Sequence, residues 1–290
     1  MRLYLLPITT RRTLLYGQRL NTAAAVAQQN ILDKAQNRAS KLWADWEKKE
    51  KGWQKSVVNY GNYALRRIPY QEWGLKSVPP LSTKRKDDEL RGTDTVEVIY
   101  PKLLVPTDRV SSVLETLSTE REALHKRKLV YCLIGMPITI PFALVPIIPN
   151  LPFFYLVYRA WSHWRALAGG KHIQFLIQNK LLTLSPSPIL DEVYAGVQPP
   201  LLSTPQPTTG PEEEGLPKNV SPNKAKHTDP PGEVMLLNQA NGKKAAQLLD
   251  LPQLEVELER AIWQVETAMK NQEEEDPKEQ EKEKDKEKQQ

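Results

Sequence analysis

The histidines and the cysteine are the side chains of this sequence best suited to chemistry. The four histidines lie far apart, and no two have the i, i+4 spacing that places two metal ligands on one helical face. A single cysteine can form neither a thiolate metal site nor an intrachain disulfide. The sequence contains no phosphate-binding glycine loop, no dinucleotide-binding fingerprint and no HExxH motif. We therefore expect no catalytic residues, no metal site, no cofactor and no enzymatic activity.

His163 has the richest surroundings of the four histidines. It lies between Trp161 and Trp164, and Arg159 and Arg165 are close by in the sequence. Because an unperturbed histidine has a pKa of about 6.5, His163 could sense pH near an interface. A histidine that is simply hydrogen-bonded within the fold is the commoner case, and both interpretations stay open.

An uncharged apolar run extends from Leu129 to Tyr158 and leads directly into the segment that contains His163. A helix crosses a bilayer with about 20 apolar residues, so the run is long enough to do so. Interior prolines argue against one straight helix. Two membrane interpretations remain: a kinked single span, or a helical hairpin that bends at 146–152 between arms at about 129–145 and 153–168. A helical pair buried in a soluble core is the alternative without a membrane. The prolines of the run are Pro137, Pro141, Pro146, Pro149 and Pro152.

Charge favours the hairpin and a lipid partner. The chain has a net charge of +5 and a pI near 9.0, and residues 123–190 contain no carboxylate. Basic residues flank the apolar run at both ends, which predicts that both ends lie on the same side of a membrane. A basic surface also suits anionic lipid, and the candidates for that contact are Lys126, Arg127 and Lys128. No nucleic-acid-binding motif accompanies the charge, so we expect no nucleic-acid partner.

The amino-terminal segment has two interpretations. Residues 1–20 are rich in arginine and threonine and lack acids, which is typical of a mitochondrial targeting segment. Apolar and polar residues also alternate over 1–6, which indicates a strand. Residues 95–100 (TVEVIY) form the clearest predicted strand, and the two segments could pair.

The rest of the chain is predicted to be mainly helical. We expect helices over 18–51 and 109–128, and an amphipathic stripe over 42–64 that packs into a core in preference to binding a partner. Gly169-Gly170 is expected to end a helix. The segment 171–184 could be a short helix or a strand.

The carboxyl-terminal third divides by composition. Residues 185–231 are rich in Pro, Ser, Thr and Gly and are predicted to be a disordered linker. Residues 232–270 form an amphipathic helical region whose stripe over 251–269 must dock either on this chain or on another protein. Residues 271–290 form a charged tail. The predicted fold is mainly α: a helical body with a Pro-rich apolar helical hairpin, and a small two-stranded β element if the two strands pair.

Two stretches resemble the fungal mitochondrial potassium/proton exchange-related family. One is the opening MRLYLLPITTRRTLLYGQRL, and the other contains PITIPFALVPIIPNLPFFYLVYRAWSHWRA. The resemblance covers about 1–184, which we take as the family domain, with a weaker extension at 251–269. It singles out functional candidates in the hairpin and beside it. These candidates are Pro141, Pro146, Pro149, Asn150, Pro152, Tyr158, Arg159, His163 and Arg165.

The resemblance implies a protein of the mitochondrial inner membrane with a part in potassium/proton exchange and thus in matrix volume homeostasis. A hairpin without a carboxylate is a poor ion path alone. We therefore expect a component or regulator of exchange that works with membrane lipids and with a protein partner or further copies of itself. The alternative is a membrane-associated helical scaffold that binds proteins and transports nothing.

Overall fold

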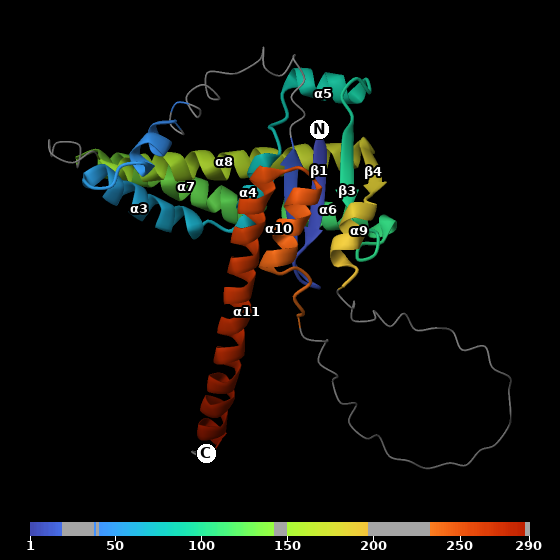
Figure 1. The fold of residues 1–290 in the computed structure, drawn as a ribbon. Coiled ribbons are helices and arrows are strands. Elements are labelled where there is room, and N and C mark those ends of the chain that lie inside the picture. Colours follow the sequence, from blue (N-terminus) through green and yellow to red (C-terminus); the bar gives the residue numbers. More distant parts are fainter. Residues whose placement is uncertain (19–37, 39–40, 142–149, 197–232, 288–290) are drawn as a thin grey trace, which may run out of the picture.

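A four-stranded mixed sheet lies at the centre of the protein (Figure 1). This computed structural model describes residues 1–18, 38, 41–141, 150–196 and 233–287. The strand order is β2-β1-β3-β4, in which β1 pairs antiparallel with β2 and parallel with β3, and β3 pairs parallel with β4. The strands are β1 (Arg2–Pro7), β2 (Thr13–Gln18), β3 (Val96–Tyr100) and β4 (Leu182–Pro186).

Both predicted strands are confirmed, and they pair as β1 and β3, with Leu3 opposite Val98. The sheet is nevertheless twice as large as predicted. β2 comes from the arginine- and threonine-rich opening segment, and β4 comes from the segment left open between helix and strand. The amino-terminal segment is therefore structural, while its role in mitochondrial targeting stays a prediction.

Helices pack on both faces of this sheet (Figure 1). Residues 41–47 are also helical, within the predicted helix at 18–51, most of which lies outside the described residues. The predicted helix at 109–128 is in fact two helices that meet at Glu120–Arg121. The helices are α3 (Trp53–Arg66), α4 (Tyr70–Ser77), α5 (Thr83–Leu90), the short 3-10 helix η1 (Thr107–Arg109), α6 (Val110–Thr119), α7 (Glu122–Thr139), α8 (Leu151–Gln178), α9 (Pro188–Tyr194), α10 (Gln239–Leu248) and α11 (Pro252–Glu287). Of these, α3, α7 and the first part of α8 extend away from the sheet to one side (Figure 1).

Each face of the sheet has its own apolar core, because alternate side chains of a strand point to opposite faces. Leu3 and Leu5 of β1 belong to one cluster, which includes residues of α4, α6 and α8. Tyr4 and Leu6 belong to the other cluster, which includes residues of α9, α10 and α11. The protein is thus a three-layer structure in which β1 is buried on both sides.

The carboxyl-terminal stripe docks on this chain. Leu254, Leu258 and Ile262 of α11 are at most 1% exposed and pack in the second cluster. The expected linker begins later than predicted, because β4 and α9 are formed after Leu181 and Tyr194 is fully buried. Most of the linker lies outside the described residues. Of the predicted charged tail, 271–287 continues helix α11 away from the body (Figure 1).

The predicted apolar hairpin is not shown. Helices α7 and α8 do lie side by side (Figure 1), and their contacts run in opposite order along the chain: the Asn150 amide donates to the Thr139 carbonyl, and Gly135 faces Leu156. The expected bend, however, falls largely on 142–149, outside the described residues. The apolar run is divided between the end of α7 and the start of α8, and charged residues occupy the remainder of each. Among the described residues, no helix combines the length and apolarity needed to cross a membrane.

Gly169 and Gly170 do not end a helix, because α8 continues to Gln178. A Cβ on Gly169 would lie 2.0 Å from the carbonyl oxygen of Leu75, and one on Gly170 would lie 2.9 Å from that of Ser118. The two glycines instead allow α4 and α6 to approach α8 closely.

The predicted core position of the stripe over 42–64 is also wrong. Within α3 only Val58 is buried, while Trp53 is 54% exposed and Tyr60 is 77% exposed. The stripe is helical in two pieces, 41–47 and α3, with a break at 48–52, and periodicity cannot tell a buried face from an exposed apolar one.

Candidate functional site

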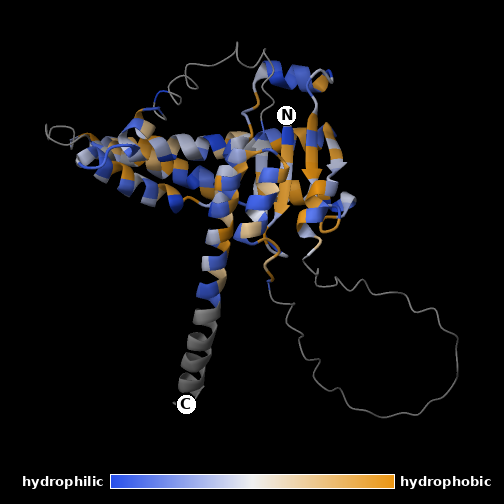
Figure 2. Cartoon of the chain, viewed as in Figure 1, coloured by the Kyte–Doolittle hydropathy of each residue, from blue (hydrophilic) through white to orange (hydrophobic). Residues whose placement is uncertain are grey.

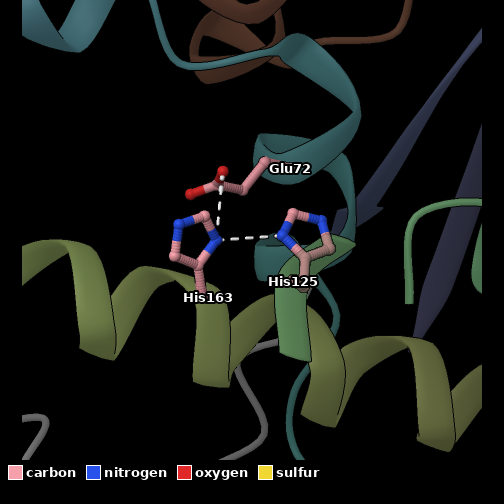
Figure 3. A group of neighbouring side chains, drawn as sticks. All are labelled: Glu72, His125 and His163. Atoms are coloured by element: carbon pink, nitrogen blue, oxygen red, sulfur yellow. Dashed lines mark hydrogen bonds and ion pairs between the residues drawn. The ribbon is translucent and has the colours of Figure 1, made fainter. Parts of the chain in front are cut away.

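Three helices bring ionisable side chains together beside the sheet (Figure 3). Glu72 comes from α4, His125 from α7 and His163 from α8. All three are at most 2% exposed. A buried group of this kind requires partners for each charge and each polar atom.

Arg159 holds the Glu72 carboxylate in a two-point ion pair. Its Nη1 lies 2.7 Å from Oε1 and its Nη2 lies 3.0 Å from Oε2, and the Ser162 hydroxyl also donates to Oε1. Burial alone would raise the pKa of Glu72, but the hydrogen bonds from Arg159 and Ser162 outweigh it and lower the pKa. The carboxylate is therefore ionised, and its charge is matched by Arg159.

The hydrogen-bond partners determine which histidine nitrogens carry hydrogen. Nη2 of Arg159 lies 3.0 Å from Nε2 of His163. Because a guanidinium only donates, Nε2 must accept, and neutral His163 carries its hydrogen on Nδ1. That Nδ1 lies 2.9 Å from Nδ1 of His125, which must then accept and carry its own hydrogen on Nε2. Nε2 of His125 is buried and has no partner among the described residues.

Both histidines are neutral at neutral pH. Burial lowers the pKa of His163 to about 4; the attraction of Glu72 opposes the shift, while Arg159 and His125 add to it. Burial likewise lowers the pKa of His125. A proton added to either ring would break the chain of hydrogen bonds that joins Arg159 to the two rings.

The spacing of the cluster would allow a metal ion. One ligand atom each from Glu72, His125 and His163 lie within 4.8 Å of one another, and two neutral imidazoles with a carboxylate are ligands that suit Zn²⁺. Arg159 opposes this use, because it occupies both carboxylate oxygens and fixes the Nδ1 hydrogen of His163 toward the space between the ligands. The described residues therefore fit a hydrogen-bonded proton site better than a metal centre.

Lys76 lies one helical turn after Glu72 and is 8% exposed. Its Nζ is 3.5 Å from the ring centre of Trp73 and 5.3 and 5.4 Å from those of Tyr158 and Trp161. Nζ donates to the Tyr158 hydroxyl at 3.3 Å, and no described carboxylate forms a salt bridge with it. Burial lowers the pKa of Lys76 to about 8, although Glu72 opposes the shift.

A separate buried pair fastens α5 to α8. Nε2 of His172 lies 2.8 Å from a Glu89 oxygen, and its Nδ1 donates to the carbonyl of Pro79 at 2.8 Å. Because both nitrogens are engaged within the fold, we assign this pair a structural role.

The structure brings some of the candidate residues together. Arg159 and His163 meet at the cluster, whereas Tyr158 and Arg165 contact the neighbouring Lys76, through its amine and its carbonyl. Asn150 instead caps α8 by accepting from the Phe153 amide at 3.1 Å.

The remaining candidates do not join the cluster. Pro141 and Pro152 are exposed, and Pro146 and Pro149 lie outside the described residues. The basic residues of the lipid-contact group are also exposed, and one of them pairs with Glu122 on the same helix. The members of that group are Lys126, Arg127 and Lys128.

Sequence reasoning missed Glu72, Lys76 and the pairing of His125 with His163. One signal was available: Arg159 and His163 share a helical face, and a buried arginine requires an acid. Because 123–190 contains no carboxylate, that acid had to come from another segment. Nothing in the sequence indicated which of the many acids it was.

Acid should destabilise the protein through His163. Its folded pKa of about 4 lies below its unfolded value of 6.5, so between these pH values the unfolded chain binds the proton and the folded chain does not. Stability is thus expected to fall as pH decreases from 6.5 toward 4. Urea unfolding at a series of pH values measures this loss. A His163→Asn variant should show a shallower slope, and an equally steep slope in that variant would contradict the assignment.

The fold and site define a mainly helical protein with a small mixed sheet and a buried ionisable cluster. The model of the mitochondrial K+-H+ exchange-related family matches residues 2–177, and the chain belongs to this family. An uncharacterized protein of Schizosaccharomyces pombe is 36% identical over 172 residues, which cover 59% of this chain and 72% of that protein. An uncharacterized protein of Saccharomyces cerevisiae is 30% identical over 216 residues, 65% of this chain and 67% of its own length. No solved structure matches the chain.

Proposed function

We propose that this protein is a component or regulator of potassium/proton exchange at the mitochondrial inner membrane, and so contributes to matrix volume homeostasis, without enzymatic activity. The family supports the link to mitochondrial exchange. The observation that carries the membrane part is the apolar surface of the paired helices α7 and α8, which extend away from the sheet (Figures 1 and 2).

That surface is unusually rich in large apolar side chains. Ile138 is 68% exposed and Phe154 is 60% exposed. An extensive apolar surface on a folded protein marks a site for a protein or a membrane. Exposed basic residues of α7 precede the surface, and they would add attraction to anionic lipid. Its other exposed apolar members are Val130, Tyr131, Leu133, Ile134, Tyr155, Val157 and Trp164.

The positions of the ionisable residues agree with a role as component or regulator. An ion path normally places ionisable groups where the ion passes. Here the carboxylate of Glu72 is paired with Arg159, and both side chains are buried between α4 and α8. Exchange would therefore require a protein partner or further copies of this chain.

Swelling of isolated mitochondria in potassium acetate tests the proposal. Deletion of the gene should abolish potassium-dependent proton exchange, and re-expression of the intact chain should restore it. Normal exchange and normal matrix potassium after deletion would overturn the proposal. Purified protein in potassium-loaded vesicles separates the two versions, because proton-coupled flux from the protein alone would make it the carrier.

Replacing Ile138 by glutamate should weaken membrane attachment. The change places a charge in the middle of the apolar surface, where burial in lipid would be costly, at no cost in core packing. Flotation with vesicles that contain anionic lipid measures attachment. Gln178→Glu, an equally charged change at an exposed position of α8, is the control and should float like the unmodified chain.

The exposed aromatic face of α3 favours a second candidate, a scaffold that binds proteins without any role in exchange. Trp53, Tyr60 and Tyr63 are each more than half exposed. Aromatic residues of this kind are enriched at protein interfaces. This candidate replaces the first if deletion leaves exchange intact while a Tyr60→Ala variant loses a protein that co-purifies with the intact chain.

A further inference from the structure

We propose that the buried amine of Lys76, which the rings of Trp73, Tyr158 and Trp161 surround, is a proton-binding site, and that loss of its proton alters the contact of Trp73 with Arg260 of α11. This inference concerns the purified chain and does not depend on the proposed role in exchange.

Burial of Lys76 favours the neutral amine, and few groups compensate the ammonium for the loss of water. An ammonium has three hydrogens to donate, yet the only described acceptor is the Tyr158 hydroxyl at 3.3 Å. The faces of Trp73, Tyr158 and Trp161 supply the remaining attraction. Burying a charge without an ion pair is costly, and loss of the proton removes that cost.

Charged groups from each neighbouring helix face Lys76. Glu72 on α4 and Glu257 on α11 attract the ammonium, whereas Arg159 on α8 and Arg260 on α11 repel it. On α8, Tyr158 stays protonated through this range because burial raises its pKa to about 12. The acids and the arginines oppose each other, so burial decides where Lys76 titrates.

Trp73 is the residue whose contacts would change when Lys76 loses its proton. The guanidinium of Arg260 lies 4.4 Å from its ring centre, and the ammonium of Lys76 lies 3.5 Å from it. Two cations thus share one indole, and one of them belongs to the carboxyl-terminal helix. When Lys76 becomes neutral, its attraction to the ring is lost and its repulsion of Arg260 ends. The indole is left with Arg260 as its cation, which shifts its contacts toward α11.

Nuclear magnetic resonance of the intact chain with ¹³C-labelled lysine side chains tests the titration directly. One lysine Cε signal should titrate with a midpoint at about pH 8. Loss of that signal in Lys76→Met assigns it. If no lysine signal titrates at about pH 8, the proposal is wrong.

Tryptophan fluorescence tests the consequence. Emission should change with the same midpoint in the unmodified chain and in Lys171→Met, an exposed control on α8, but not in Lys76→Met. Should Lys76→Met fail to fold, Lys76→Arg serves instead, because an arginine keeps its charge throughout the range and should abolish the change. A pH-dependent emission change that persists in these variants would overturn the role of Trp73.

Discussion

Replacing Glu72 by glutamine is expected to lower the free energy of unfolding by about 3–5 kcal/mol, the usual cost of leaving one member of a buried ion pair without its partner. The change keeps the size of the side chain but removes the charge that Arg159 faces through two hydrogen bonds. Arg159 is only 8% exposed, so water cannot replace the carboxylate. Urea unfolding followed by circular dichroism measures the loss.

Two further variants make the Glu72 result specific. Glu122→Gln removes the acid of an exposed pair with Lys126, which is worth at most about 1 kcal/mol, and should change stability little. Adding Arg159→Met to Glu72→Gln should recover part of the loss, because the second change removes the uncompensated charge. A loss for Glu72→Gln no larger than that for Glu122→Gln would show that the buried pair is not formed.

Replacing Gly169 by alanine should cost about 3 kcal/mol or more, at or above the upper end of the usual range for overpacking. The new Cβ would lie 2.0 Å from the Leu75 carbonyl oxygen, which belongs to the backbone of α4 and cannot rotate away. Helices α4 and α8 would have to separate, and the Glu72–Arg159 pair joins these same helices. Thermal unfolding measures the loss.

Gly196→Ala is the control for Gly169, because no atom of the described residues lies within 4 Å of its added Cβ. We expect no measurable loss from this change. If Gly169→Ala were also neutral, the close approach of α4 to α8 would be wrong, and the position of Glu72 beside Arg159 would be in doubt with it.

The sequence predicted those elements whose signals are local. Alternation in 95–100 identified β3, and the helical stripe over 251–269 identified the buried face of α11. Local signals failed where a distant segment decides the outcome. Gly169-Gly170 has the composition of a helix end. Gly169 instead allows close approach of the backbone of α4, which lies far away in the sequence.

The candidate site likewise contains some residues that local sequence signals identify and others that they do not. Arg159 and His163 could be found because they share a helical face within a distinctive segment. Glu72 and Lys76 lie in the short segment YQEWGLKS, which forms α4. Their importance arises only from burial against α8 and α11, and burial of a charged residue cannot be inferred from its type.

A segment that precedes α10 meets the tip of the β1–β2 hairpin, although more than 200 residues separate the two in the sequence. The amide of Leu236 donates to the Ile8 carbonyl, and the Thr10 amide donates to the carbonyl of Val234. β1 and β2 are synthesised before α11, so the apolar cluster that contains Tyr4 and Leu6 is complete only when α11 has been made. Pairings so distant in sequence form slowly. Tyr4 and Leu6 therefore stay incompletely covered while the residues between β2 and α11 are synthesised, and we expect the growing chain to need chaperones that bind exposed apolar segments.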